Sequence, residues 1–174
     1  MNPLDFTGRT ILVVGGSSGI GNGIAQAFRA HGGTVHVWGT RAAAADYSAA
    51  EGSDLTGLHY ARVDAADTAA VEGWQPPFAT LDVLVLSQGI VIYDRGEYAN
   101  AGFARVIDVN LNSVMACALK FEKMLKASRG ALITVSSTAA FHSTRGNPAY
   151  NASKAGVVGL TRTLGDAWSR SGVR

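Results

Sequence analysis

The stretch Val13–Phe28, VVGGSSGIGNGIAQAF, joins an apolar run to an amphipathic one through a glycine-rich turn. Gly15, Gly19 and Gly21 fall in it at G-x3-G-x-G spacing. Because glycine has no Cβ, the backbone of such a turn can approach a pyrophosphate, whose charge then faces the free N–H groups of the following helix. The stretch therefore predicts a strand, a phosphate-binding turn and a helix, in that order.

A plain strand-to-helix connection without a ligand is the alternative for this turn. The spacing differs from G-x-G-x-x-G, because Ile24 stands where that motif has its third glycine. Ser17 and Ser18 add two hydroxyl donors beside the glycines. The turn by itself does not distinguish a phosphate-binding site from a plain connection without a ligand.

Short apolar runs alternate with helical patterns along the remaining chain. The apolar runs are continuous, which is typical of strands buried on both faces of a parallel sheet. These runs are Thr10–Val14, Thr34–Gly39, Leu58–Val63, Leu81–Ser87 and Ala131–Ser136. Helical spacing follows the glycine turn as far as Gly32, and it recurs over Phe103–Leu119 and Tyr150–Ser169. The pattern predicts an α/β fold with a doubly wound parallel sheet, while Arg41–Ser53 stays open as a helix or a mobile surface turn.

Length and composition narrow the class of protein. The 174 residues predict one domain, 1–174, with a buried core, since 47% are hydrophobic and 16% charged. The net charge of +2 is scattered, so we expect no nucleic-acid partner. Cys117 is the only cysteine, which excludes an internal disulfide, and no metal site is expected. No secretory signal and no apolar run of ~20 residues is present, so we expect a cytoplasmic protein without a membrane partner.

The stretch YNASK places Tyr150 and Lys154 four residues apart, and therefore on one face of a helix. A phenol has a pKa of ~10, and a nearby ammonium group favours its ionised form. A tyrosine tuned in this way can pass a proton to or from a substrate oxygen. Tyr-x3-Lys arises easily by chance, and a surface tyrosine packed on a lysine side chain is the alternative.

Two further polar positions fit a reaction site. Ser137 follows the fifth predicted strand, at the strand end where open α/β sheets bind ligands, although a Ser-Ser pair there is more often a turn. Asn110 lies inside a helical pattern, where asparagine is mildly unfavourable, and Asn112 competes with it for the same role. Neither position identifies a reaction without Tyr150 and Lys154.

In combination these residues resemble the short-chain dehydrogenase/reductase family. Its fingerprint T-G-x3-G-I-G is matched by Val14–Gly21, except that Val14 replaces the threonine. The resemblance implies a Rossmann fold, an NAD(P)-dependent oxidoreductase acting on a small-molecule alcohol or ketone, and a homo-oligomer, either a dimer or a tetramer. The catalytic set that it implies is Asn110, Ser137, Tyr150 and Lys154.

The resemblance also implies the residues that bind the cofactor. They are Gly15, Ser17, Ser18, Gly19, Ile20, Gly21, Thr40, Arg41, Asp64, Gly89, Tyr150 and Lys154. Asp64 is expected to contact the adenine amino group, with a helix N-cap as its alternative role. In Leu86–Gly89, LSQG, only Gly89 matches the family's N-N-A-G. This departure leaves open how the cofactor ribose is held.

The residues after the second predicted strand bear on the choice of cofactor. NAD-preferring members of the family usually carry an acid there, and NADP-preferring members a base that binds the 2′-phosphate. This chain reads Gly39-Thr40-Arg41. The missing acid and Arg41 favour NADP(H), with NAD(H) as the alternative. A solvated loop charge is the alternative role for Arg41.

Two other functions stay open. A non-catalytic NAD(P)-binding sensor or scaffold module would account for the LSQG departure, and a lyase or epimerase can use the same fold. In the family a sixth strand, a segment closing over the substrate and a seventh strand come next, and Val173 fits the start of such a strand. We therefore expect a domain truncated after its fifth βα unit, in a natural protein that continues beyond Arg174.

Overall fold

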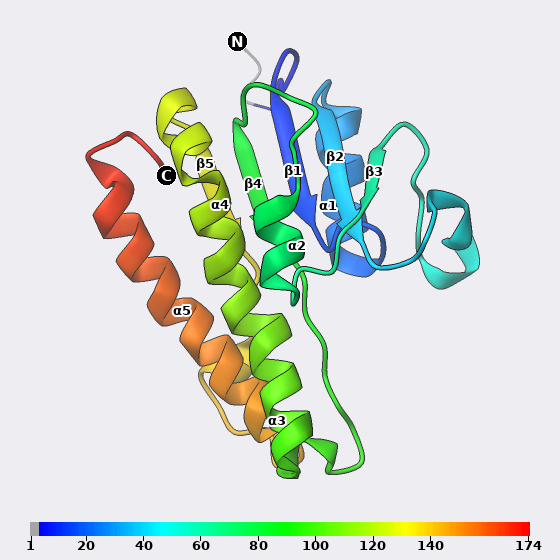
Figure 1. The fold of residues 1–174 in the computed structure, drawn as a ribbon, viewed down its shortest axis with the longest axis vertical. Coiled ribbons are helices and arrows are strands. Elements are labelled where there is room, and N and C mark those ends of the chain that lie inside the picture. Colours follow the sequence, from blue (N-terminus) through cyan, green and yellow to red (C-terminus); the bar gives the residue numbers. More distant parts are fainter. Residues whose placement is uncertain (1–3) are drawn as a thin grey trace.

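Five parallel strands form one sheet in the order β3-β2-β1-β4-β5 (Figure 1). The structure is a computed structural model that describes residues 4–174. The strands are β1 (Thr10–Val14), β2 (Thr34–Gly39), β3 (His59–Arg62), β4 (Val83–Leu86) and β5 (Ala131–Thr134). The first two have the predicted bounds. The last three are shorter than predicted, because the regular pairing with a neighbouring strand covers only these residues. The chain reverses its direction across the sheet beside β1, which confirms the doubly wound α/β fold.

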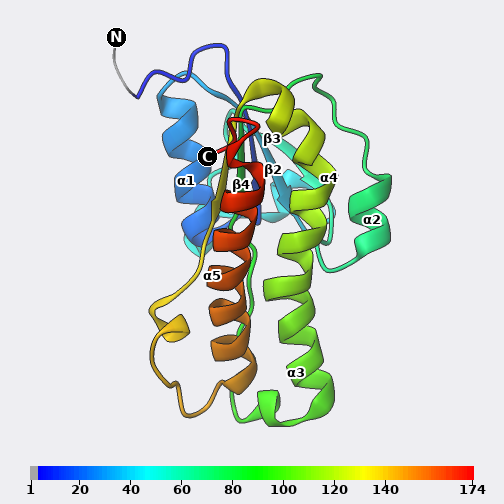
Figure 2. The ribbon, with the colours of Figure 1, turned by 90° about the vertical axis from the view of Figure 1, so that its left-hand side faces the viewer.

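Helices cover both faces of this sheet. The α-helices are α1 (Gly19–Ala30), α2 (Thr68–Gly73), α3 (Asn100–Ile107), α4 (Ser113–Ser128) and α5 (Pro148–Ser169). A π-helical turn, η4 (Asp108–Asn112), joins α3 to α4. The view in Figure 2 shows α1 on one face of the sheet, and α2 and α4 on the other. The predicted helical pattern over Phe103–Leu119 is therefore continuous, with the π-helical turn η4 between α3 and α4.

The segment Arg41–Ser53, for which a helix or a mobile turn was open, contains two short 3₁₀ helices. These are η1 (Ala44–Asp46) and η2 (Ala49–Glu51). Two further 3₁₀ turns, η3 (Gly96–Tyr98) and η5 (Thr138–Ala140), lie in the loops after β4 and β5. The β2-to-β3 connection thus has no α-helix, in contrast to the connections that follow β1, β3, β4 and β5.

The core has two layers, one on each side of the sheet. Ile11 and Val13 of β1 pack with α1 residues, while Leu12 and Val14 pack with residues of α2, α4 and α5. All four side chains are fully buried, as the continuous apolar run predicts. Each contributes about 1.5–3 kcal/mol relative to an exposed position. Cys117 is also a buried core residue, as expected.

The outer edge of β5 is paired by the residues that follow α5. The Leu132 N–H donates to the Arg174 carbonyl at 2.8 Å, and the Arg174 N–H donates to the Gly130 carbonyl at 3.0 Å. Val173 is buried within the core layer on the α4 side. This chain segment therefore runs beside β5, as the start of a further strand would.

Candidate active site

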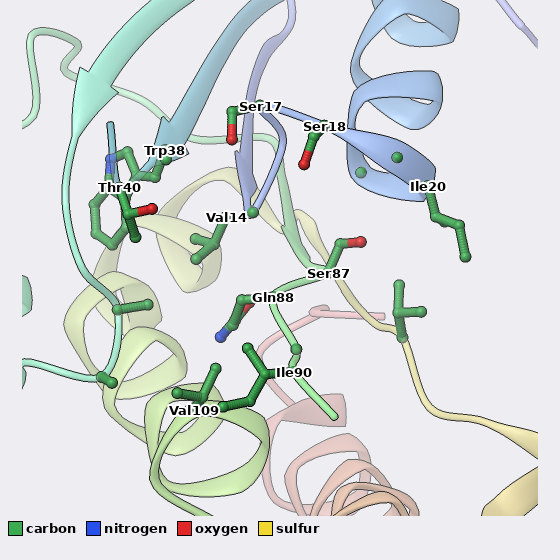
Figure 3. Close-up of a pocket in the computed structure, with 18 of the residues that line it drawn as sticks. Val14, Ser17, Ser18, Ile20, Trp38, Thr40, Ser87, Gln88, Ile90 and Val109 are labelled. Atoms are coloured by element: carbon green, nitrogen blue, oxygen red, sulfur yellow. The ribbon is translucent and has the colours of Figure 1, made fainter. Parts of the chain in front are cut away.

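A cavity of about 570 Å³ lies at the carboxyl ends of the strands, where the strand order reverses. Figure 3 shows Ser17 and Ser18 of the glycine turn along one side of it, with Gln88 and Val109 along the opposite side. Every predicted cofactor residue except Arg41 lines this cavity. They are Gly15, Ser17, Ser18, Gly19, Ile20, Gly21, Thr40, Asp64, Gly89, Tyr150 and Lys154.

Two positions of the turn require glycine. A Cβ at Gly15, which has a φ of +73°, would lie 2.8 Å from the Gln88 Cα, and a Cβ at Gly21 would lie 2.2 Å from the Gly15 carbonyl oxygen. The α1 helix begins after Ser18 with no side-chain cap and no acidic residue in its first turn. A pyrophosphate therefore fits at this helix start, since an anion there meets backbone N–H groups and the positive end of the helix dipole.

Asn110 lies in the π turn, and its side chain is completely buried. Its Oδ1 accepts from the Ile90 N–H at 2.7 Å, and its Nδ2 donates to the Ile90 carbonyl at 2.9 Å and to Ser153 Oγ at 3.2 Å. Asn112, the competing candidate, is exposed and donates to Asp108 Oδ1 at 2.8 Å. The fold therefore brings Asn110, and not Asn112, to the loop after β4.

Tyr150 and Lys154 lie on one face of α5, as their spacing predicts. The ammonium group of Lys154 is 5.6 Å from the centre of the Tyr150 ring and donates to the Val135 carbonyl at 2.9 Å. Burial lowers the pKa of Lys154 below its usual value. A Cβ at Gly89 would lie 3.4 Å from Lys154 Nζ and 3.5 Å from Asn110 Oδ1. Tyr150 and Lys154 thus line one part of the cavity, while the buried Asn110 side chain lies next to Gly89 and does not line it.

Ser137 follows β5 as predicted, but it does not line the cavity. Its Oγ accepts from the Ala139 N–H at 3.1 Å and caps η5. The neighbouring Ser136 lines the cavity and donates to the Lys154 carbonyl at 2.8 Å. Since a hydroxyl can donate while it accepts, the contact with Ala139 does not use the Ser137 proton.

Asp64 lines the cavity and does not cap a helix. The alternative role is wrong, because Asp67 is the N-cap of α2 and accepts from the Ala70 N–H at 3.1 Å. Asp64 Oδ1 accepts from the Ala66 N–H at 3.0 Å, and its Oδ2 lies 3.6 Å from the guanidinium group of Arg105. Arg105 also lines the cavity, and the sequence analysis did not identify it. It comes from α3, so only the folded chain brings it to Asp64.

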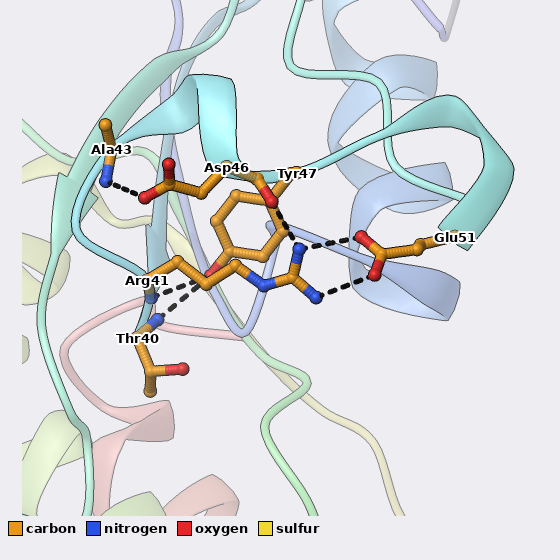
Figure 4. A network of polar contacts seen from close by, with 6 residues as sticks. All are labelled: Thr40, Arg41, Ala43, Asp46, Tyr47 and Glu51. Carbon is orange, nitrogen blue, oxygen red and sulfur yellow. Dashed lines mark hydrogen bonds and ion pairs between the residues drawn. The ribbon is translucent and has the colours of Figure 1, made fainter.

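Arg41 is the predicted cofactor residue that lies outside the lining of the cavity. Its side chain forms an ion pair with Glu51 at 2.7 Å, within its own loop (Figure 4). The adjacent residue Thr40 does line the cavity. Arg41, the base expected to bind a 2′-phosphate, is therefore next to the cavity. Its charge is paired with Glu51, so it is neither unpaired nor simply solvated.

The LSQG departure is packed into the structure. Gln88 is buried, and its Nε2 donates to Ser113 Oγ at 2.8 Å, which in turn donates to the Val109 carbonyl at 2.6 Å. Its Oε1 is buried and has no hydrogen-bond partner among residues 4–174. Gln88 thus links the loop after β4 to the π turn that carries Asn110.

Glu97 is a buried acid that the sequence analysis missed. Its Oε2 accepts from the Tyr150 N–H at 2.9 Å, and its Oε1 accepts from Asn147 Nδ2 and from the Ile92 N–H, both at 3.2 Å. The carboxylate therefore holds the first turn of α5 to the loop after β4. No local signal could have found it, because 53 residues separate Glu97 from Tyr150.

The described part of the chain contains neither a candidate metal site nor a helix suited to cross a membrane. Residues 4–174 contain no group of three or more histidine, cysteine, aspartate or glutamate side chains that could hold a metal ion. Within the same residues, no helix has the combination of length and apolar character that crossing a membrane requires.

Comparison with known proteins decides the family. The family described as short chain dehydrogenase matches residues 9–174. The chain belongs to the short-chain dehydrogenase family. It is 34% identical over 172 residues to the 3-oxoacyl-acyl-carrier-protein reductase FabG of Chlamydia muridarum, covering 94% of this chain and 69% of that protein. It is 33% identical over 175 residues to the 2-dehydro-3-deoxy-L-rhamnonate dehydrogenase (NAD(+)) of a Sphingomonas species, covering 97% and 69%.

Solved structures agree with this assignment. The Pseudomonas aeruginosa RhlG/NADP active-site complex superposes with a TM-score of 0.87 at 27% identity, covering all of this chain and 73% of that one. Levodione reductase superposes with a TM-score of 0.85 at 26% identity, covering 97% and 69%. This short-chain dehydrogenase is an NAD(P)-dependent oxidoreductase that acts on alcohol or ketone groups, and the relatives named above give no support to the non-catalytic alternative.

Proposed function

We propose that Tyr150 is the general acid–base of the alcohol–ketone interconversion. The bound nicotinamide supplies or accepts the hydride. Tyr150 gives a proton to the ketone oxygen in reduction and takes it from the alcohol in oxidation. Lys154 favours the ionised phenol and holds the nicotinamide ribose. Ser137 donates a hydrogen bond to the substrate oxygen. The backbone carbonyl of Asn110 supports the relay of protons to Lys154.

The observation that carries this proposal is that Tyr150 and Lys154 line the same cavity as the glycine turn, with Asn110 next to Gly89. Lys154 Nζ lies 5.6 Å from the centre of the Tyr150 ring. The lowered pKa of Lys154 follows from its burial, and in such a site the interaction between the two groups is screened less by water. The same cavity continues to the helix start that fits a pyrophosphate.

For the cofactor we propose NADP(H), with Asp64 on the adenine amino group and Thr40 and Arg41 beside the adenosine ribose. The support is the sequence Gly39-Thr40-Arg41, in which no acid stands where a 2′-hydroxyl would be held. Known relatives include both kinds, since one is named as an NAD(+) enzyme and the RhlG structure contains NADP. We further propose that the protein is cytoplasmic and forms a homo-oligomer. Size-exclusion chromatography with light scattering tests the oligomeric state.

The test uses the full-length protein. Fluorescence titration with NADPH and NADH measures binding, and an unbiased panel of alcohols and ketones with both cofactors measures turnover. We expect binding and turnover with at least one substrate, and Tyr150→Phe is expected to bind the cofactor without turnover. Cofactor binding with no turnover across a broad panel would contradict the proposal and favour a sensor or scaffold module.

A further inference from the structure

The loop between β2 and β3 is attached to the glycine turn. The Gly52 carbonyl accepts from the Gly19 N–H at 3.3 Å. Asn22 of α1 accepts from the Asp54 N–H and donates to the Asp54 carbonyl, both at 2.8 Å. The segment that carries Glu51 is therefore held beside the proposed phosphate site and does not extend freely into solvent.

Arg41 has its charged group committed within this loop. Its guanidinium donates to both oxygens of Glu51, at 2.7 and 3.2 Å, and to the Asp46 carbonyl (Figure 4). It also lies 4.6 Å from the centre of the Tyr47 ring. A two-point contact with a carboxylate is the same geometry that arginine uses for a phosphate. Glu51 therefore occupies the face of Arg41 that a phosphate would need.

The same loop is tied to the edge of the cavity. Tyr47 Oη accepts from the Thr40 N–H at 3.1 Å and from the Arg41 N–H at 3.2 Å. Thr40 lines the cavity. A phosphate bound beside Thr40 would thus be one residue away from Arg41, and the two anions would compete for a single guanidinium group.

We propose that Glu51 is a specificity-determining residue for the cofactor, because it holds Arg41 as an internal counter-ion. The 2′-phosphate of NADP(H) has to take the guanidinium from Glu51, whereas NAD(H) has no group that needs it. Glu51 thereby weakens the preference for NADP(H) that Arg41 alone would create. This inference rests on the proposed function, since it requires the cavity to bind a dinucleotide.

The protonation of Glu51 is consistent with this role. Its hydrogen bond with Arg41 lowers the pKa of Glu51 below its usual value. The carboxylate is therefore ionised at neutral pH and competes with a phosphate as a full charge. Both side chains are about half exposed, so the competition is expected to be modest.

The experiment is a double-mutant cycle on the full-length protein, with Glu51→Gln, Arg41→Ala and the two combined. Titration with NADPH and with NADH gives a dissociation constant for each. We expect Glu51→Gln to tighten NADPH binding by about two- to fivefold and to leave NADH binding unchanged. In the Arg41→Ala background, the same substitution is expected to have no effect, since no guanidinium is left to release.

Glu72→Gln is the matched control, because it removes the same charge from α2, outside the lining of the cavity. An equal change for both dinucleotides would overturn the inference. So would an effect of Glu51→Gln that persists without Arg41, because plain charge repulsion would then explain it. A protein that bound neither dinucleotide would instead contradict the proposed function itself, which separates the two failures.

Discussion

The two ends of the cavity are built in different ways. At the end proposed to be catalytic, Asn110, Ser153 and Lys154 are buried, and their polar atoms bond to the backbone or to one another. Next to the end proposed to hold the adenosine ribose, here called the ribose end, Arg41 and Glu51 are exposed and pair across a loop of short 3₁₀ turns. Buried polar groups cost much free energy when they lose a partner, whereas exposed pairs cost little. Changes at the catalytic end should therefore affect rate and folding, and changes at the ribose end only the choice of cofactor.

The largest expected effect is on turnover in Tyr150→Phe. The ring stays and only the hydroxyl is lost, so kcat should fall by about 10²- to 10⁴-fold, the usual contribution of a general acid–base. Cofactor affinity should stay within a few-fold of the unsubstituted protein. Steady-state kinetics and a fluorescence titration measure the two quantities. A variant that kept a tenth of its activity would refute the assignment.

Lys154→Ala should damage both quantities, because this side chain has two proposed tasks. We expect kcat to fall by about 10²-fold, since the ammonium group beside the phenol is lost, and dinucleotide affinity to fall by about tenfold. Lys123→Ala is the control, since Lys123 is exposed on α4 and does not line the cavity. A loss of affinity with unchanged kcat would contradict the role in catalysis.

Glu97→Ala tests whether the catalytic end depends on buried hydrogen bonds. The substitution removes the acceptor of the Ile92 and Tyr150 N–H groups, and one of the two acceptors of the Asn147 side-chain amide. We expect the free energy of unfolding to fall by about 2–4 kcal/mol, as for other buried charged partners. Urea denaturation measures it, with the exposed Glu72→Ala as control. Equal stability of the two variants would mean that the contacts of Glu97 add nothing.

A smaller effect is expected at the ribose end, in Arg41→Ala. Loss of the base should weaken NADPH binding by roughly tenfold or less and leave NADH binding and stability unchanged. Parallel titrations and a urea curve check all three quantities. A tighter binding of NADH than of NADPH in the unsubstituted protein would contradict the preference for NADP(H). A large loss of stability would contradict the contrast between the two ends.

Much of the fold was predictable because its signals are local. The glycine turn at the start of the first helix was predictable because its backbone leaves no room for a Cβ. The structure confirms this at Gly15 and Gly21. Continuous apolar runs predicted all five strands, and β1, β2 and β4 are buried as expected. The prediction of burial on both faces is wrong for the edge strands β3 and β5, whose residues are half-buried or exposed. Strand ends were less accurate, because the neighbouring strand decides how far pairing extends. The loop Arg41–Ser53 has no apolar periodicity, so its 3₁₀ turns could not be predicted.

Local sequence is sufficient to show which residue types share a helix face or a turn, such as Tyr150 with Lys154, because i,i+4 spacing and backbone sterics act within a few residues. Which distant groups meet depends on the folded chain. The folded chain brings the Glu97 carboxylate into contact with the first turn of α5 and Arg105 close to Asp64. It also brings Glu51 into an ion pair with the guanidinium group of Arg41. Such contacts depend on how the sheet orders its strands and how loops close over it, and no spacing along the chain records that arrangement.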